Sequence, residues 1–296
     1  MKINTKIILL VVAIVAVVAI LFSQSSRISA ADNRTTLAKI LNMDTSVTQV
    51  AVESVSEAAS TPDTSNLYMI DQTQAAKNAQ VIAQAKQLID KAEKQYLTPG
   101  WLHTVTTSQA FVTEQKTLPD GTLVPTWSVS EDWSLLDQNG DVIKSVSTQD
   151  VGDPRLFQAS VYADGISTNL SLGTSVEQTP YHMTFGSGIL DISDADKQVD
   201  KFSTETAMVG GQKTVVFIVR EDLKTPVGVG KDTQSDNQMY VYVTKYYFSA
   251  ISGLPVQVEI YQGNSAGALK ILSRDIVKIT EKVATPPAKM LAYFTK

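Results

Sequence analysis

The pattern of apolar and polar positions divides the chain into three parts. Residues Ile7 to Phe22 carry no charged or polar side chain. From Asp71 to Tyr96 apolar residues recur every three or four positions, and from Trp101 onward they recur every second position. The first period is that of an amphipathic helix and the second that of a half-buried strand. The pattern predicts an apolar N-terminal helix, one long amphipathic helix and then a series of strands.

The amphipathic helix has recognisable ends. Asp71, with Gln74 three residues later, predicts a capping box at its start, and Thr98-Pro99-Gly100 ends it. Because the apolar stripe is rich in alanine, we expect it to pack closely on a sheet rather than on a membrane surface, where bulkier anchors are usual. The stripe contains Ala75, Ala79, Ile82, Ile89, Ala92 and Tyr96, widened by Val81, Ala85 and Leu88.

Turn sequences separate the expected strands. Favoured hairpin turns occur at Asp120-Gly121, at residues 137–141, at 163–165, at Ser252-Gly253 and at Gly263-Asn264. Strands are expected from Trp101 to about Val112, around 127–135, and at 213–220, 239–248, 254–261 and 269–279. Residues 174–201 break this rhythm, and a short helix is expected within 191–201. Consecutive hairpins favour antiparallel pairing, so the predicted fold class is α+β, with a helix covering one face of an antiparallel sheet.

The apolar run near the N-terminus predicts export. Lys2 and Lys6 precede it, and Ile28-Ser29-Ala30 is a small-residue exit site. Its sixteen residues lie between the core of a signal peptide and a membrane-spanning helix, so residues 1–30 are a signal peptide or a retained signal anchor. Either alternative places the body outside the cytoplasm, secreted or held on the membrane by residues 7–22. Residues 31–66 are expected to form a flexible stalk, and 67–296 the folded domain.

Composition excludes several classes of function. The net charge of −5 becomes −8 without the three basic residues of the leader (Lys2, Lys6 and Arg27), which is poorly suited to nucleic acid. The chain has no cysteine, which removes disulfides, thiolate catalysis and thiolate metal sites together. No cofactor motif is present, and none is expected.

Apparent metal and catalytic motifs have simpler interpretations. Asp137, Asn139 and Asp141 resemble the start of a calcium loop, but an EF-hand would need glycine and glutamate where Val142 and Thr148 stand. A hairpin turn is the favoured interpretation, and the acidic cluster at 191–200 is read as a helix cap. The chain has two histidines, His103 and His182, with no nucleophile elbow and no zinc spacing. A partly buried, hydrogen-bonded imidazole is expected at His103.

Glu131 breaks the alternation of its strand. It lies between Val129 and Trp133, on the parity that should face a core. Burial of an unpaired carboxylate is costly, so a bulge or an edge position is expected to turn it outward. A carboxylate within a pocket is the alternative.

Aromatic residues crowd one strand near the C-terminus. Tyr240, Tyr242, Tyr246, Tyr247 and Phe248 give it bulk on both faces, so cover is expected on each side, by protein alone or by protein and a ligand. The residues proposed to line a ligand site are Trp127, Trp133, Phe217, Val219, Val241 and Val243.

The C-terminal half resembles the LolA/RseB-like superfamily of bacterial envelope proteins, which includes LppX/LprG-like members. The resemblance is carried by 246–249, by Ser252-Gly253-Leu254-Pro255-Val256 with Glu259 in the following strand, and by Pro286-Pro287 near the end. It covers about residues 70–296. The resemblance implies a curved, unclosed half-barrel whose concave face is apolar and lidded by helices, and which carries or senses acylated molecules. The chain departs from the family in its long stalk and in having no lipobox cysteine.

Three hypotheses of function follow. The first is a non-catalytic extracytoplasmic module that binds an apolar or acylated ligand. The second is a structural or signalling ectodomain that binds an envelope protein partner and has no ligand cavity. The third, a hydrolase that uses His103 or His182, is the least favoured, and the protein is not expected to be an enzyme.

Overall fold

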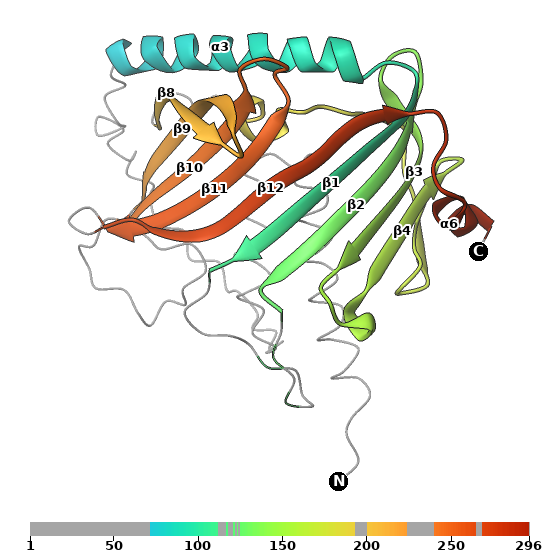
Figure 1. Ribbon diagram of the computed structural model, residues 1–296. Coiled ribbons are helices and arrows are strands. Elements are labelled where there is room, and N and C mark those ends of the chain that lie inside the picture. Colours follow the sequence, from blue (N-terminus) through green and yellow to red (C-terminus); the bar gives the residue numbers. More distant parts are fainter. Residues whose placement is uncertain are drawn as a thin grey trace, which may run out of the picture.

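The computed structural model describes residues 72–111, 117, 121, 123, 125–192, 200–223, 240–264 and 268–295. The leader, the stalk and the capping residue Asp71 lie outside these residues. The described part is a 12-stranded antiparallel sheet that curves without closing, with helix α3 (Gln72–Tyr96) across one end of its strands (Figure 1). The predicted fold class is confirmed.

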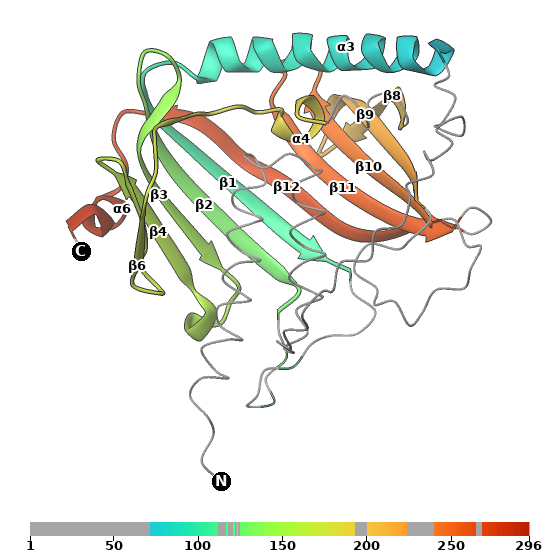
Figure 2. The same ribbon diagram turned by 180° about the vertical axis from the view of Figure 1, so that it is seen from behind.

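The sheet consists of two halves that meet at a seam. Its order is β6-β5-β4-β3-β2-β1-β12-β11-β10-β9-β8, and β7 pairs with β3. The seam joins the first and last strands of the series, β1 and β12, which lie at the centre of the sheet (Figure 2). The first half is β1 (Gly100–Ala110), β2 (Trp127–Leu136), β3 (Asp141–Asp150), β4 (Gln158–Ala163), β5 (Ile166–Asn169), β6 (Thr174–Glu177) and β7 (Tyr181–His182). The second half is β8 (Lys201–Val209), β9 (Gln212–Leu223), β10 (Tyr240–Ser249), β11 (Pro255–Asn264) and β12 (Lys270–Val283).

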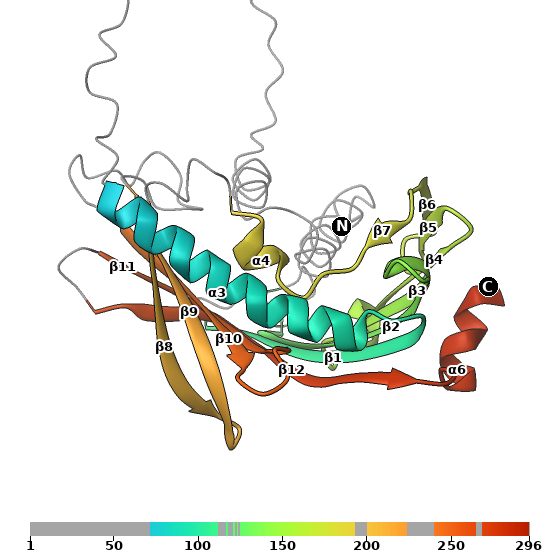
Figure 3. The same cartoon turned by 90° about the horizontal axis from the view of Figure 1, so that it is seen from above.

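The two faces of the sheet have different covers. Helix α3 and the short helix α4 (Ser187–Leu190) lie on the concave side, as Figure 3 shows. Helix α6 (Ala288–Leu291) and the following 3-10 turn (Ala292–Thr295) pack on the convex side, where Met290 is buried with Trp133, Val146 and Val161. Pairing registers assign every strand residue to one face or the other.

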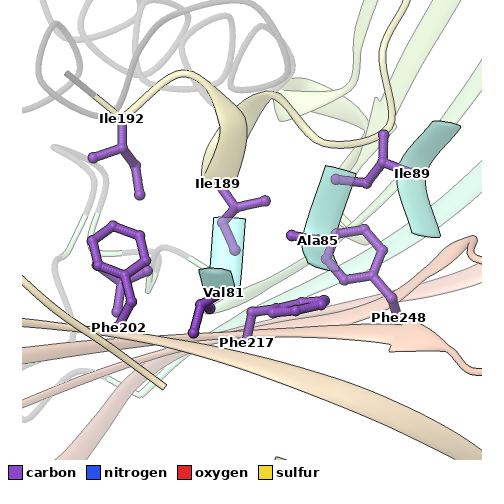
Figure 4. Close-up of a cluster of buried hydrophobic side chains, with 9 residues drawn as sticks. Val81, Ala85, Ile89, Ile189, Ile192, Phe202, Phe217 and Phe248 are labelled. Atoms are coloured by element: carbon purple, nitrogen blue, oxygen red, sulfur yellow. The ribbon is translucent and has the colours of Figure 1, made fainter. Parts of the chain in front are cut away.

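Helix α3 is held by a packed core rather than by a layer of ligand. Val81, Ala85 and Ile89 pack with Ile189 and Ile192, and with Phe202, Phe217, Val219 and Phe248 from the sheet (Figure 4). Farther along, Tyr96 and Leu97 join a second cluster with Leu102, Leu136 and Val142. The buried stripe therefore runs through Val81, Ala85, Ile89 and Ala92, whereas Ala79, which we expected on this stripe, is exposed.

Several local predictions are confirmed and two are wrong. Turns join β2 to β3, β4 to β5 and β10 to β11 as expected. The short helix expected within 191–201 falls mainly on residues 193–199, which lie outside the described part, so it stays a prediction. The turn expected at Gly263-Asn264 is wrong, because both residues still belong to β11 and pair with β10. The bulge expected at Glu131 is also wrong, because β2 pairs in unbroken register with β1, and its register with β3 shifts only between Leu135 and Leu136.

Candidate functional site

Along one row of residues across the sheet, the concave face changes from apolar to polar. A single row of directly paired residues crosses it from β9 to β2: Phe217, Tyr246, Val258, Asp275, Ser108 and Ser128. The first three are large and mainly apolar, and the last three carry a carboxylate or a hydroxyl. The change falls between β11 and β12.

The polar half of this face is built from alternate residues of β1 to β4. Successive strand residues point to opposite faces, so the hydroxyl residues share one side while Trp133, Val146 and Val161 share the other. On the other side of the seam, Asp275 and Ser273 of β12 continue this polar surface. The residues are Thr104, Thr106 and Ser108, then Ser128, Ser130, Asp132 and Ser134, then Ser145, Ser147 and Gln149, and finally Gln158 and Ser160.

Asp275 is the carboxylate at the boundary. Burial raises its pKa above the usual range for aspartate, and a hydrogen bond from Ser108 opposes the rise only in part. A neutral carboxyl group can donate a hydrogen bond as well as accept one. The boundary thus offers a group that can serve either as donor or as acceptor to a polar ligand.

The apolar half of the concave face is only partly covered by α3 and α4. Tyr246 donates a hydrogen bond from its hydroxyl to the carbonyl of Gly188, 2.7 Å away, so its ring lies under α4. Toward the seam, Val258 and Ile260 of β11 are half-buried and lie outside the buried clusters of the described residues. They form the accessible apolar surface next to the hydroxyl residues.

The six residues predicted to line a ligand site occupy both faces of the sheet. Phe217 and Val219 lie on the concave side, in the core under α3. Val241 and Val243 are buried on the opposite face, because their partners on β9 are Asp222 and Arg220. Trp133 is buried against α6, and Trp127, 48% exposed, rests against Gly152 on the convex side. They do not share one surface, and a contact between any of them and a ligand stays a prediction.

Glu259 anchors a network on the convex face. It is 3% exposed and accepts hydrogen bonds from the hydroxyls of Tyr247 (2.7 Å) and Tyr261 (2.6 Å) and from Nε of Arg274 (2.7 Å). Burial would raise the pKa of Glu259, but these three donors outweigh it and hold the pKa below its usual value. With its carboxylate oxygens bonded to three side chains of the same sheet, Glu259 is a structural ion rather than a catalytic one.

His103 lies between two carboxylates on the same face. Its Nδ1 is 3.0 Å from Oε1 of Glu281 and its Nε2 is 3.4 Å from Oε1 of Glu131, while its ring stacks on Trp133 at 3.8 Å. Trp133 donates its indole N–H to Glu131 at 3.0 Å. The expected hydrogen-bonded, buried imidazole is confirmed, and these contacts explain how Glu131 keeps its place in the alternation.

The other motifs singled out from the sequence are structural. Asp137 accepts hydrogen bonds from the backbone N–H groups of Asn139 and Asp141, so the hairpin interpretation of this turn is confirmed. His182 pairs with Asp141 at 3.1 Å and is exposed. Within the described ranges no group of three or more acidic or histidine side chains could hold a metal ion. In the same ranges no helix is both long and apolar enough to cross a bilayer.

A hollow of about 500 Å³ lies along the exposed side of α3. Gln87, Asp90, Lys91, Lys94 and Gln95 line it. All five side chains are polar or charged, and all come from one helix. This hollow therefore does not correspond to the apolar concave face, lidded by helices, that the resemblance implies.

The sequence contains a signal for the polar face that the predictions above do not use. Ser128, Ser130, Asp132 and Ser134 occupy every second position of their strand, and apart from Glu131 the residues between them are apolar. Such an alternation is typical of the solvent side of a sheet. In the structure these residues instead lie on the concave face, and no local feature of the sequence distinguishes that face from the convex one.

Comparison with known proteins gives fold likeness at low identity. No protein-family model and no curated protein matches the chain. It is similar to MucB, solved in complex with MucA(peri), with a TM-score of 0.38 and 17% identity over 71% of this chain and 58% of MucB. The chain thus spans less than two thirds of the length of MucB.

Two further solved structures are similar. LprF from Mycobacterium bovis gives a TM-score of 0.34 and 10% identity over 70% of this chain and 98% of LprF. A domain assigned to an outer membrane lipoprotein-sorting protein from Vibrio parahaemolyticus gives a TM-score of 0.26 and 9% identity. The match covers 75% of this chain and 98% of that domain. At TM-scores below 0.5 these likenesses do not define what this chain binds.

Proposed function

We propose that this protein is a non-catalytic, extracytoplasmic binding module for an amphipathic molecule that bears an acyl chain. The observation that carries the proposal is the row across the concave face, which changes from Val258 to Asp275 at the β11–β12 boundary. A ligand with an apolar end and a polar end matches such a surface, whereas a purely apolar ligand would offer the hydroxyl residues no hydrogen bond in exchange for those they make with water.

The two ends of the ligand have separate seats in this proposal. The acyl chain lies along Val258 and Ile260, and the polar group lies over the hydroxyl residues of β1 to β4. The resemblance implied a concave face that is apolar throughout. Its serine-rich half makes the proposed ligand an amphiphile with a hydroxylated or amide-bearing head rather than a free fatty acid.

Substitution of Ile260 tests the apolar seat. In the full chain, Ile260→Glu is expected to weaken binding of a fluorescent fatty acid at least tenfold. A tenfold loss of affinity corresponds to about 1.4 kcal/mol of binding free energy, and burial of a carboxylate against an acyl chain costs more than that. The matched control is Ile279→Glu on β12, where the side chain is 38% exposed on the convex face. Equal loss in both variants would contradict the proposed seat.

A paired substitution tests the polar seat. Ser147 and Ser160 are direct partners on β3 and β4, so Ser147→Ala with Ser160→Ala removes two neighbouring hydroxyls. We expect the wild type to bind a lysophospholipid with a glycerol head more tightly than the fatty acid of equal chain length, and the double variant to lose that preference. Thr168→Ala with Ser175→Ala, an exposed hydroxyl pair on β5 and β6, is the control.

The alternative is an ectodomain that binds a protein partner without a ligand. The filled core between α3 and the sheet favours it. Native mass spectrometry of the full chain, released from membranes in mild detergent, separates the two functions. A co-purifying amphiphile supports the first. Its absence, together with no response to either lipid, supports the second.

A further inference from the structure

Strand β8 forms one open edge of the sheet. It is the last strand in the sheet order, it spans nine residues, and among the described residues it pairs with β9 alone. The opposite edge, β6, has only four residues. A long edge strand presents a row of backbone N–H and C=O groups that another strand can pair with.

The β8–β9 turn determines which backbone groups face outward. Gly210 has a φ of +55° and Gly211 a φ of +81°. They join Val209 directly to its partner Gln212, which makes a two-residue hairpin. The pair that flanks such a turn exchanges backbone hydrogen bonds, and alternate residues along the strand do the same. Odd-numbered residues of β8 therefore bond to β9, and even-numbered residues point their N–H and C=O groups away from it.

Helix α3 caps only the first part of this outward row. The side chain of Asn78 accepts a hydrogen bond from the N–H of Phe202 (3.1 Å) and donates one to the carbonyl of Asp200 (2.7 Å). The amide of Asn78 thus takes the place of a neighbouring strand at these two residues. Beyond the cap, Thr204, Thr206 and Met208 have outward groups that no described strand pairs with, and all three are exposed.

This uncapped stretch lacks the usual devices that protect an edge. It contains no proline, its register with β9 is unbroken, and its one charged residue, Glu205, is bound by Lys245 at 3.0 Å. Figure 3 shows the β8–β9 hairpin extending away from α3 and from the rest of the sheet. An approaching strand would meet neither the helix nor the body of the domain.

We propose that the occupant of this edge is β8 of a second copy of the chain, antiparallel, with the two-fold axis at Thr206. This register places Thr204 opposite Met208 of the second copy and Thr206 opposite its own counterpart. All three outward residues of each copy are then paired, with roughly six new backbone hydrogen bonds. Phe202 remains with Asn78, so the ladder ends where the cap begins.

The side chains are compatible with this register. Glu205 lies opposite Ala207 of the second copy and Ser203 opposite Val209, so no like charges meet. Because the axis is perpendicular to the sheet, both copies keep α3 on the same side and the two sheets become continuous. The concave ligand surface of the proposed function takes no part in this contact.

The absence of native cysteine allows a direct test by cross-linking. In an antiparallel hydrogen-bonded pair the Cα atoms are about 5.5 Å apart, within the range of a disulfide. Full-length Thr206→Cys, oxidised in membranes with copper phenanthroline, is expected to give a disulfide-linked dimer on a non-reducing gel. Ser203→Cys is the control, because its two copies would lie about 20 Å apart.

A mixed sample fixes the register. Co-expressed Ser203→Cys and Val209→Cys chains are expected to form a heterodimer at least tenfold more abundant than either homodimer. The proposal is overturned if Thr206→Cys gives no more dimer than Ser203→Cys, if all single variants cross-link equally, or if Thr206→Cys links instead to another protein.

Discussion

At the scale of single residues, Glu259 illustrates how a carboxylate stays ionised inside a sheet. Its three donors stand on three strands, Tyr247 on β10, Tyr261 on β11 and Arg274 on β12. Burial, reinforced by the hydrogen bond to Glu259, raises the pKa of Tyr261 to about 12, so this hydroxyl remains a donor across the physiological range. The network joins three strands on a face that is otherwise covered by few elements.

Removal of the charge of Glu259 is expected to destabilise the fold. Glu259→Gln should lower the free energy of unfolding at neutral pH by about 2 kcal/mol. This is less than for a fully buried pair, because the side chain of Arg274 is 38% exposed. Since the folded-state pKa is depressed, the loss should shrink as pH falls below the ordinary value of 4.5. Urea denaturation at pH 7 and pH 4 measures the loss of stability and its dependence on pH. Glu177→Gln on the exposed strand β6 is the control. A loss that is the same at both pH values would contradict a stabilising role for the ionised carboxylate.

Asp275 is expected to show the opposite dependence on pH. Its pKa is raised in the folded state, so its favourable contribution is present below the ordinary value of 3.8 and is lost as pH rises through the raised value. Asp275→Asn should therefore increase the melting temperature at pH 7 and change it little once the pH is below that ordinary value. If the variant is less stable than the wild type at pH 7, the ionised carboxylate has a partner whose stabilising interaction exceeds the free-energy cost of burial, which would contradict this prediction.

Single-residue predictions from sequence failed where the answer depended on a distant strand. Glu131 looked costly in its alternation because nothing within its own strand showed that His103 would stand beside it from β1. Val241 and Val243 looked equivalent to Phe217 and Val219 because all four are apolar strand residues. The pairing register between β9 and β10 places the two pairs on opposite faces, and sequence periodicity does not fix that register.

At the scale of elements, the β10–β11 turn and α3 are fitted to each other at Gly253. A Cβ at this position would lie 2.1 Å from the carbonyl oxygen of Leu88 and 3.4 Å from the backbone nitrogen of Ala92. Gly253 also has a φ of +76°, which residues with a side chain rarely adopt. The small residue thus serves both the turn and the close approach of the helix.

Substitution of Gly253 separates these two requirements. Gly253→Ala should lower the free energy of unfolding by about 3 kcal/mol or more, because it combines a backbone penalty with a steric clash against helix backbone. Gly210 has a φ of +55° and no atom within 4 Å of an added Cβ. Gly210→Ala should therefore lose only about 1 kcal/mol. Chemical denaturation of both variants measures the difference, and equal losses would show that the turn alone requires glycine.

Elements with local signals were the part of the fold that could be predicted. The helix ends at Tyr96 as its stop signal indicates, and the Asp137 and Ser252-Gly253 turns join the strands that they were expected to join. Strand β8 was missed, because the expected strands begin only at residue 213 in this part of the chain. Its residues 203–206 are serine, threonine, glutamate and threonine, and its apolar residues do not recur at every second position, so an edge strand of this kind resembles a loop.

At the scale of the whole molecule, the seam between β1 and β12 makes the ends of the folded domain neighbours. Each half of the sheet has its own buried clusters, but α3 packs against both, through Ile89 in one and Tyr96 in the other. Because the seam and the helix both bridge the halves, we expect the domain to unfold as one cooperative unit. The order of the strands could not be derived from sequence, since this seam joins segments about 170 residues apart.

The positions of the tryptophans allow this cooperativity to be measured. Trp101, Trp127 and Trp133 are the three tryptophans of the chain, and all lie on β1 and β2, whereas Ile89 packs on the other half against Phe217 and Phe248. Ile89→Ala should lower the free energy of unfolding by about 3 kcal/mol through the cavity that it leaves. If the halves unfold together, tryptophan fluorescence and far-UV circular dichroism will shift to lower urea by the same amount, although the substitution is remote from every tryptophan. A shift in circular dichroism without one in fluorescence would show that α3 and the seam do not couple the halves. The β1–β4 half, with its hydroxyl-lined surface, would then remain folded while the acyl seat beside α3 is lost.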